Sequence, residues 1–120
     1  MIKFLKGFGF AFAGLWQMVL HERNFKVHIL ALLVVVSAGF YFQVTPNEWL
    51  ILLLISALVL ALETINSAIE KMCDLYTKET HPQLKLIKDI AAGAVLIAAI
   101  FAVVIAIIIF KKYIILTLFI

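Results

Sequence analysis

The sequence predicts an all-α membrane protein, with an N-terminal helix along the membrane surface followed by three membrane-spanning helices. Hydrophobic residues make up 66% of the 120 residues, compared with roughly 45 to 50% in soluble domains. The chain also contains three apolar blocks, each close to the roughly 20 residues that cross a hydrocarbon core. Because only short polar links separate these blocks, we expect a single domain over residues 1–120.

Residues 1–22 are predicted to form an amphipathic surface helix. At about 100° per residue, the polar residues and two glycines share one face, while the remaining surface is apolar and rich in phenylalanine. A helix of this kind lies in the membrane interface. A cleaved signal peptide fits less well, because polar residues interrupt the apolar run and no small-residue cleavage site follows it. The polar face contains Lys3, Lys6, Gly7, Gly14, Gln17 and His21.

The three spans are expected at residues 27–43, 47–76 and 83–110. The link "QVTPNEW" contains Pro46 and predicts a tight hairpin between the first two spans, with Trp49 as an interface anchor and a candidate lipid contact. The second span begins in an apolar block and continues through the amphipathic stretch "ETINSAIEKMCD" (63–74), so it should project beyond the membrane. The second link ends at Pro82, a residue favoured at the first position of a helix.

Lysine and arginine predict the orientation of the chain, because cytoplasmic loops are enriched in both. These residues gather before the first span and between the second and third, whereas the "QVTPNE" link has none. The protein is therefore expected to be a multi-pass protein of the cytoplasmic membrane, with its functional site on the cytoplasmic side. This bias also explains the net charge of +3, so we expect no nucleic-acid partner. The basic residues on the two cytoplasmic segments are Lys3, Lys6, Arg23, Lys26, Lys71, Lys78, Lys85 and Lys88.

A polar stripe near the end of the second span is the strongest functional signal. Glu63, Ser67, Glu70 and Asp74 fall within an arc of roughly 60° on a helix, with Asn66 to one side. An ionisable side chain at the centre of a span costs on the order of 2.5 to 3.5 kcal/mol and indicates function by default. The alternative is that the stripe is only the solvated end of the helix, which suits Asp74 better than Glu63.

The residue types in this region are compatible with phosphoryl transfer. A hairpin centred near residue 79 would bring Lys88 and Asp89 level with Glu70. A kinase site needs a metal ligand, a cation for the phosphates and a base for the hydroxyl, and Glu70, Lys88 and Glu63 could supply them. The chain has no GxxxxGK[ST] or GxGxxG loop, so a nucleotide site would not be of the common soluble types. The three histidines, including His28, lack the spacing of zinc ligands.

The segment "ETINSAIEKMCDLYTKETHPQLKLIKDIAAGAV" (63–95) resembles the signature of the small bacterial membrane diacylglycerol kinase and undecaprenol kinase family. That signature reads E-x-x-N-[ST]-A-I-E-x-x-x-D … H-x(6)-K-D-x-A-[AS]-[GA]-A-V. The segment "HERNFKVH" (21–28) resembles the second motif of the family, and the resemblance covers nearly the whole chain. It implies a bacterial inner-membrane homotrimer, with active sites shared between subunits, that uses MgATP to phosphorylate a membrane lipid hydroxyl.

The resemblance also implies roles for individual residues around the acceptor and the metal. Glu63 would be the general base that contacts the lipid hydroxyl, and Asn66 its polar neighbour. Glu22 and Glu70 would bind Mg²⁺.

The same resemblance implies residues that bind the nucleotide. Four of them lie on the second link and the third span, and two lie on the first helix. The family has an arginine and a tyrosine at those two positions, so a bidentate contact and a hydroxyl group are missing here. The residues implied are Lys88 and Asp89 at the phosphates, Glu79 and His81 at the nucleoside, and Lys3 and Phe10 on the first helix.

The acceptor and the class of function each leave an alternative. The "ERN" and "AAGAV" segments resemble the undecaprenol kinase branch, so we expect undecaprenol as the acceptor, with diacylglycerol as the alternative. A non-enzymatic protein is the alternative class, either a proton-coupled transporter that uses Glu63 or an assembly subunit. A transporter often has internal repeats and an acid near the membrane midplane, whereas this chain has no repeat and its charges gather at one rim.

Overall fold

The computed structural model describes residues 1–119, which form four helices and no strand. This architecture confirms the all-α fold class. Three of the helices are long and apolar enough to cross a membrane, as expected from the three apolar blocks. The helices are α1 (Ile2–His21), α2 (Arg23–Phe42), α3 (Pro46–Tyr76) and α4 (Pro82–Phe119).

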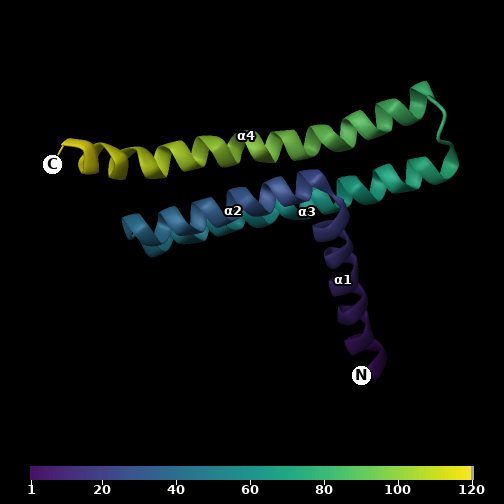
Figure 1. The fold of residues 1–120 in the computed structure, drawn as a ribbon, viewed down its shortest axis with the longest axis horizontal. Coiled ribbons are helices and arrows are strands. Elements are labelled where there is room, and N and C mark those ends of the chain that lie inside the picture. Colours follow the sequence, from purple (N-terminus) through teal and green to yellow (C-terminus); the bar gives the residue numbers. More distant parts are fainter. Residues whose placement is uncertain (120) are drawn as a thin grey trace.

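The three long helices α2, α3 and α4 run alongside one another, and α1 projects from them to one side (Figure 1). α3 packs against both α2 and α4. The chain turns from α1 into α2 at Glu22, whose extended backbone (φ −100°, ψ 111°) interrupts the helix. Because α1 leaves the bundle sideways, it can lie along the membrane surface when the other three helices cross it.

The hairpin between α2 and α3 follows from local sequence. Gln43 ends α2 in the left-handed conformation, with φ 52°. Thr45 and Glu48 then form a reciprocal capping box: the Glu48 N–H donates to Thr45 Oγ1, and the Thr45 N–H donates to Glu48 Oε1. Pro46 occupies the first helical position, where it has no N–H to leave unsatisfied. The sequence "TPNE" therefore starts α3 with little help from the rest of the molecule.

Trp49 holds α2 and α3 together at this end of the bundle. Its ring lies against Gly39, where an added Cβ would come within 2.5 Å of the indole, and its centroid is 5.0 Å from that of Phe40. The ring packs against the small apolar core formed by Val44, Leu52, Ile109 and Phe110. Trp49 thus lies at the opposite end of the bundle from the polar stripe of α3, and its role as an interface anchor and lipid contact stays a prediction.

Glu48 forms a polar cluster that the sequence did not predict. It is buried, with 8% of its surface exposed, and accepts hydrogen bonds from the Lys112 ammonium at 2.7 Å and from the Tyr113 hydroxyl. These contacts connect the α2–α3 hairpin to α4. The contact between Glu48 and Lys112 was not predicted because the two residues are far apart in the sequence. Both nevertheless flank apolar runs at the same end of antiparallel helices.

Replacing Glu48 with alanine should destabilise the bundle and leave the specific activity of the folded protein unchanged. The change removes both the cap of α3 and the contact to α4, and a lost cap alone costs about 0.5 to 2 kcal/mol. We expect the thermal midpoint in detergent to fall by about 5 °C or more. Glu48→Gln is the matched control, because glutamine retains the capping box but loses the ion pair. An unchanged midpoint for Glu48→Ala would show that this cluster does not stabilise the protein.

α4 continues to Phe119, past the expected end of the third span at residue 110. The following sequence "KKYIILTLF" contains no glycine or proline to stop a helix. With 38 residues, α4 is about 57 Å long and exceeds the roughly 30 Å of a hydrocarbon core. It therefore extends beyond the membrane.

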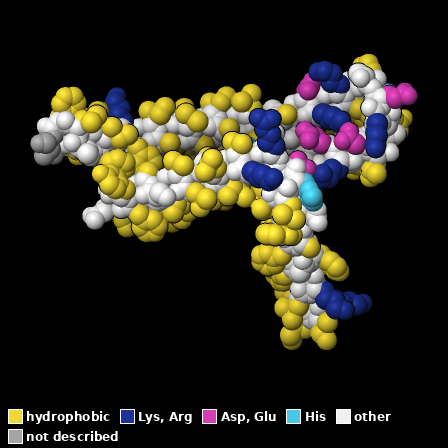
Figure 2. Space-filling view, in the orientation of Figure 1, with side chains coloured by type: hydrophobic (Ala, Val, Ile, Leu, Met, Phe, Trp, Pro, Cys, Tyr) yellow, Lys and Arg dark blue, Asp and Glu magenta, His cyan; other side chains and the backbone are white. Residues whose placement is uncertain are grey.

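Charged and apolar side chains separate along the molecule. Figure 2 shows acidic and basic groups gathered at the end where the α1–α2 corner and the α3–α4 link lie, with apolar side chains along the long helices. Many large apolar side chains of α2, α3 and α4 are exposed, including Leu54 at 74% and Ile108 at 67%. Such surfaces are expected to face lipid, and the charged end is expected to face water.

Candidate active site

Glu63 is the most deeply buried acidic side chain of the polar stripe. Only 3% of the residue is exposed, and its carboxylate lies on the side of α3 that faces the start of α2. There, His28 Nε2 is 3.8 Å from Glu63 Oε2, and the Asn24 side chain also faces the carboxylate. Glu22 and Glu70 are its acidic neighbours. A buried carboxylate with acidic neighbours is unfavourable for folding and therefore indicates a functional position.

Asn66 and Ser67 are buried one turn further along α3. The Asn66 amide donates to Glu70 Oε1 at 3.4 Å. Asn66 Oδ1 and Ser67 Oγ have no hydrogen-bond partner among the described residues. Leaving a buried polar atom unsatisfied costs about 1 to 3 kcal/mol, so both atoms are suited to contact a ligand.

Glu22, Glu70 and Asn66 offer the hard oxygen donors that Mg²⁺ prefers. The described residues contain no group of three or more histidine, cysteine or acidic side chains that could hold a metal ion by themselves. This donor set fits an ion that takes one or two carboxylates and completes its shell with phosphates and water. Glu22 Oε1 also accepts from Lys71 Nζ at 2.9 Å, so Lys71 already balances one of the two carboxylates.

Lys88 of α4 lies beside the acidic end of α3, as expected, but its closest partner differs. Its ammonium contacts Asp74 Oδ1 at 2.7 Å, with Glu70 as a further acidic neighbour. The expectation assumed that α3 and α4 pair symmetrically about residue 79, whereas the contact between Lys88 and Asp74 shows that α4 is shifted along α3 towards the link. Asp89 contacts Lys85 at 2.7 Å on the exposed surface of α4.

The α3–α4 link encloses a polar cavity of about 310 Å³. Glu79, His81 and Lys88, three of the residues implied at the nucleotide, line this cavity together. His81 is held by its own loop: its Nδ1 accepts from the Gln83 N–H at 3.2 Å, and its ring packs edge-on against Tyr76. Asp89 does not line the cavity.

Lys3 and Phe10 lie apart from the other candidate site residues within one chain. Both are on α1, which points away from the bundle (Figure 1), and 75% of Phe10 is exposed. Lys3 lines a separate shallow cavity on α1 with Phe4, Gly7, Phe8 and Ala11.

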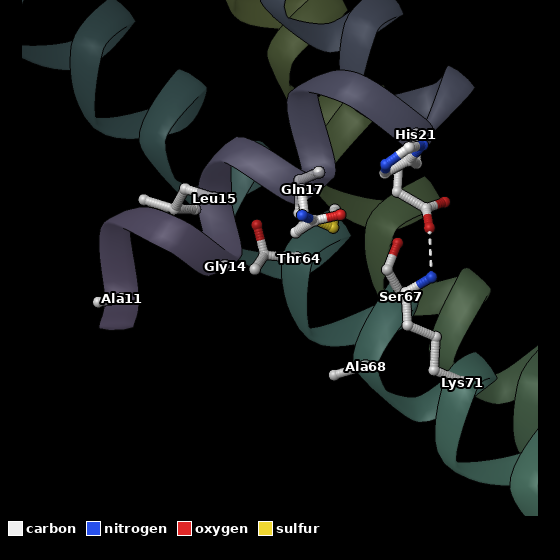
Figure 3. A pocket seen from close by; sticks show the side chains of 11 residues that line it. Ala11, Gly14, Leu15, Gln17, His21, Thr64, Ser67, Ala68 and Lys71 are labelled. Carbon is white, nitrogen blue, oxygen red and sulfur yellow. Dashed lines mark hydrogen bonds and ion pairs between the residues drawn. The ribbon is translucent and has the colours of Figure 1, made fainter. Parts of the chain in front are cut away.

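A larger cavity of about 690 Å³ lies between α1 and α3. Its size is within the range of small-molecule sites. Figure 3 shows Leu15 and Ala11 at one end and Lys71 at the other, where the Lys71 ammonium contacts Glu22. Ser67, with its unsatisfied hydroxyl, also lines it. The cavity is therefore apolar where Ala11, Leu15 and Met18 line it, and polar towards the α1–α2 corner, where Glu22 and Lys71 lie.

Comparison with known proteins identifies the family. Residues 9–110 match the model of the family described as prokaryotic diacylglycerol kinase. The chain belongs to this family. It is therefore a lipid kinase, as its motifs predicted, and the transporter and assembly-subunit alternatives are not supported. The match includes every candidate site residue except Lys3 and ends before the last turns of α4.

The relatives of this lipid kinase carry two different names. It is 39% identical over 108 residues to an undecaprenol kinase of Bacillus subtilis, covering 90% of this chain and 88% of that one. It is 37% identical over 102 residues to a diacylglycerol kinase of Synechocystis, covering 84% of this chain and 58% of that one. It is 31% identical over 102 residues to a diacylglycerol kinase of Escherichia coli, covering 85% and 84%.

His28 is a residue of this kinase that sequence patterns did not connect with the site. Its spacing from the other histidines argued against a zinc site and indicated no other role, yet the structure places it beside Glu63. The large apolar residue Phe25 could have indicated this position from the sequence, because residues three apart share a helix face. In the structure Phe25 is buried. That face of α2 turns towards α3 and carries His28 with it.

Proposed function

We propose that this lipid kinase transfers the γ-phosphoryl group of ATP to the hydroxyl of undecaprenol, forming undecaprenyl phosphate. The burial of Glu63 among acidic neighbours in an otherwise apolar bundle carries the proposal. A carboxylate in this place is suited to receive a proton from a lipid alcohol that diffuses in the membrane plane. The named activity of the Bacillus subtilis relative and the "ERN" and "AAGAV" segments support undecaprenol.

In the proposed reaction, Glu63 acts as the general base. The acceptor hydroxyl donates its proton to a Glu63 oxygen while its own oxygen attacks the γ-phosphorus, and ADP leaves. Asn66 lies one turn away and orients the groups around the base through its free amide oxygen. Because Glu63 is buried, water has little access to the reacting centre and hydrolysis of ATP is disfavoured.

Glu22 and Glu70 are proposed to hold Mg²⁺, with phosphate oxygens and water completing its shell. A Mg²⁺ ion bound there would neutralise charge on the ATP phosphates. Lys71 contacts Glu22 and would balance that carboxylate when no ion is bound.

Changing Glu22 or Glu70 to glutamine should weaken MgATP use in a way that added Mg²⁺ partly restores. Each change removes one negative charge from the proposed site, so the Mg²⁺ concentration for half-maximal rate should rise by about tenfold or more. The measurement is a Mg²⁺ titration of the initial rate at fixed ATP. Glu48→Gln, at the other end of the bundle, is the matched control and should titrate like the wild type. An unchanged Mg²⁺ dependence in both variants would remove these residues from the metal site.

The nucleotide is proposed to bind at the α3–α4 link. Lys88 and Asp89 would contact the phosphates, and Glu79 and His81 the nucleoside, on the cytoplasmic side of the membrane. Three of these residues line one polar cavity, which supports the assignment. Lys3 and Phe10 lie on α1, which projects from the bundle away from the α3–α4 link (Figure 1). We therefore propose that they reach a nucleotide bound to a neighbouring copy, in a homotrimer with shared active sites.

The cavity between α1 and α3 is proposed to receive the acceptor lipid. Its apolar wall suits a hydrocarbon chain, and its polar end lies at the α1–α2 corner, where Glu22 and Lys71 line it. A hydrophobic pocket discriminates by only about 1 to 3 kcal/mol for a methylene-sized difference, so we expect several lipid alcohols to be accepted. Diacylglycerol is the second candidate, because the relatives from Synechocystis and Escherichia coli are named diacylglycerol kinases.

A direct comparison of acceptors tests the proposal. With MgATP in one detergent, kcat/KM for undecaprenol should exceed that for diacylglycerol by about tenfold, the factor that 1.4 kcal/mol represents. The assay measures phosphorylated lipid, and a reaction without lipid corrects for ATP hydrolysis. Higher kcat/KM for diacylglycerol would overturn the choice of acceptor and leave the lipid kinase activity unaffected.

A further inference from the structure

His28 is placed to act on Glu63 from the neighbouring helix. Its Nε2 is 3.8 Å from Glu63 Oε2, a separation that a small side-chain rotation or one bridging water can close. The two side chains differ in their access to solvent, since 21% of His28 is exposed and only 4% of Glu63. His28 is therefore the more exposed partner of a buried carboxylate.

Among the described residues, His28 is the one basic side chain that pairs with Glu63. In the described part of the chain, no lysine or arginine forms an ion pair with Glu63, and the two lysines nearest the polar stripe contact other acids. Lys71 contacts Glu22, and Lys88 contacts Asp74. A buried carboxylate without a partner is strongly unfavourable, and histidine can gain or lose a proton near neutral pH.

An existing cavity adjoins His28. It measures about 240 Å³ and is lined by His28 and by small residues of the long helices, including Ser56, Ala99 and Ala102. The α4 residues that line it carry no charge, so α4 contributes no competing partner for the imidazole. The space also means that a shortened side chain at position 28 would enlarge an opening rather than create an isolated void.

We propose that His28 is a positioning residue that orients the Glu63 carboxylate and carries its proton away after each turnover. This inference rests on the proposed role of Glu63 as the base. The acceptor O–H bond breaks, its proton moves to Glu63, the new P–O bond forms, and the electron pair of the broken phosphoanhydride bond leaves with ADP. The proton then moves from Glu63 to His28 Nε2, and the imidazolium releases one proton to water. Glu63 thereby returns to its ionised form.

The test combines two substitutions with chemical rescue. His28→Gln retains hydrogen-bonding groups but cannot carry a proton, so kcat should fall by about 10- to 100-fold, with KM for ATP and for lipid nearly unchanged. His28→Ala should show a similar loss, and added imidazole should restore much of its kcat by entering the adjoining cavity. Pyrazole is the matched control, because it has the shape of imidazole but is a much weaker base. Circular dichroism confirms that each variant is folded.

Each outcome decides between a proton-carrying role and a structural one. Rescue by imidazole and not by pyrazole supports the proposal, whereas equal rescue by both would show that the ring only fills space. Should His28→Ala fail to fold, His28→Gln carries the test, and a normal kcat or a loss confined to KM would overturn the proposal. Glu63→Gln separates the two inferences. If Glu63→Gln is inactive while His28→Ala is fully active, only the proposed role of His28 is wrong. If Glu63→Gln is active, the assignment of Glu63 as the base is wrong.

Discussion

Replacing Glu63 with glutamine is expected to lower kcat by about 10²- to 10⁴-fold, the usual contribution of a general base. Glutamine has nearly the same shape and cannot accept the proton of the acceptor hydroxyl. ATP binding should be retained, because the proposed nucleotide contacts lie at the α3–α4 link, further along the bundle. The measurement is the initial rate of lipid phosphorylation together with nucleotide affinity by equilibrium binding.

The stability of the Glu63 variant distinguishes a functional carboxylate from a structural one. Because Glu63 is buried beside two acidic residues, removing its charge should leave the thermal midpoint unchanged or raise it. Ile65→Ala, a neighbouring change on the exposed side of the same helix, where Ile65 is 56% exposed, controls for disturbance of α3 and should retain most activity. Turnover near the wild-type rate in Glu63→Gln would exclude Glu63 as the base.

Replacing Lys88 with methionine is expected to lower kcat/KM for ATP by about 10²- to 10³-fold, as for other residues that stabilise charge in a transition state. The methionine side chain preserves the length and packing of the lysine stem without its ammonium group. Lys111→Met, on the same helix at the opposite end of the bundle, is the matched control and should retain activity. The measurement is the initial rate over a range of ATP concentrations.

The contact between Lys88 and Asp74 offers a competing explanation that the experiment must separate. If Lys88 only tied α4 to α3 through Asp74, Asp74→Asn would cause the same loss as Lys88→Met. If Lys88 binds phosphate, Asp74→Asn should retain most activity, because the ammonium group remains. Equal losses in these two variants would assign Lys88 a structural role.

Much of the fold was predictable because its signals are local. Apolar runs of membrane-spanning length, the "TPNE" cap and Pro82 specify where α2, α3 and α4 form, since helix formation depends on residues a few positions apart. The last turns of α4 lay outside the predicted span because Lys111 and Lys112 end the apolar block, although two charges do not end a helix. The surface helix was expected to end at residue 22 and the first span to begin at residue 27, and the structure assigns the break to Glu22 alone, which has an extended backbone.

The candidate site was predictable along each helix and less so between helices. Glu63, Asn66 and Glu70 share a face of α3 by helical period alone, and the motif that contains them is sufficient to indicate a lipid kinase. The helical period did not predict how deeply each residue of the stripe is buried. Asn66 and Ser67 are buried with free polar atoms, whereas Asp74 of the same stripe is exposed. Burial depends on which helix covers each turn.

The sequence by itself determined the helices, the charged end of the bundle and the family of this kinase, because periodicity, composition and motifs are properties of neighbouring residues. Only the tertiary structure decided which side chains meet across helices: His28 with Glu63, Lys88 with Asp74, and Glu48 with Lys112. These pairs depend on the axial offset and rotation of one helix against another. The geometry of the links and the packing of side chains set both quantities, and neither is encoded in a local pattern.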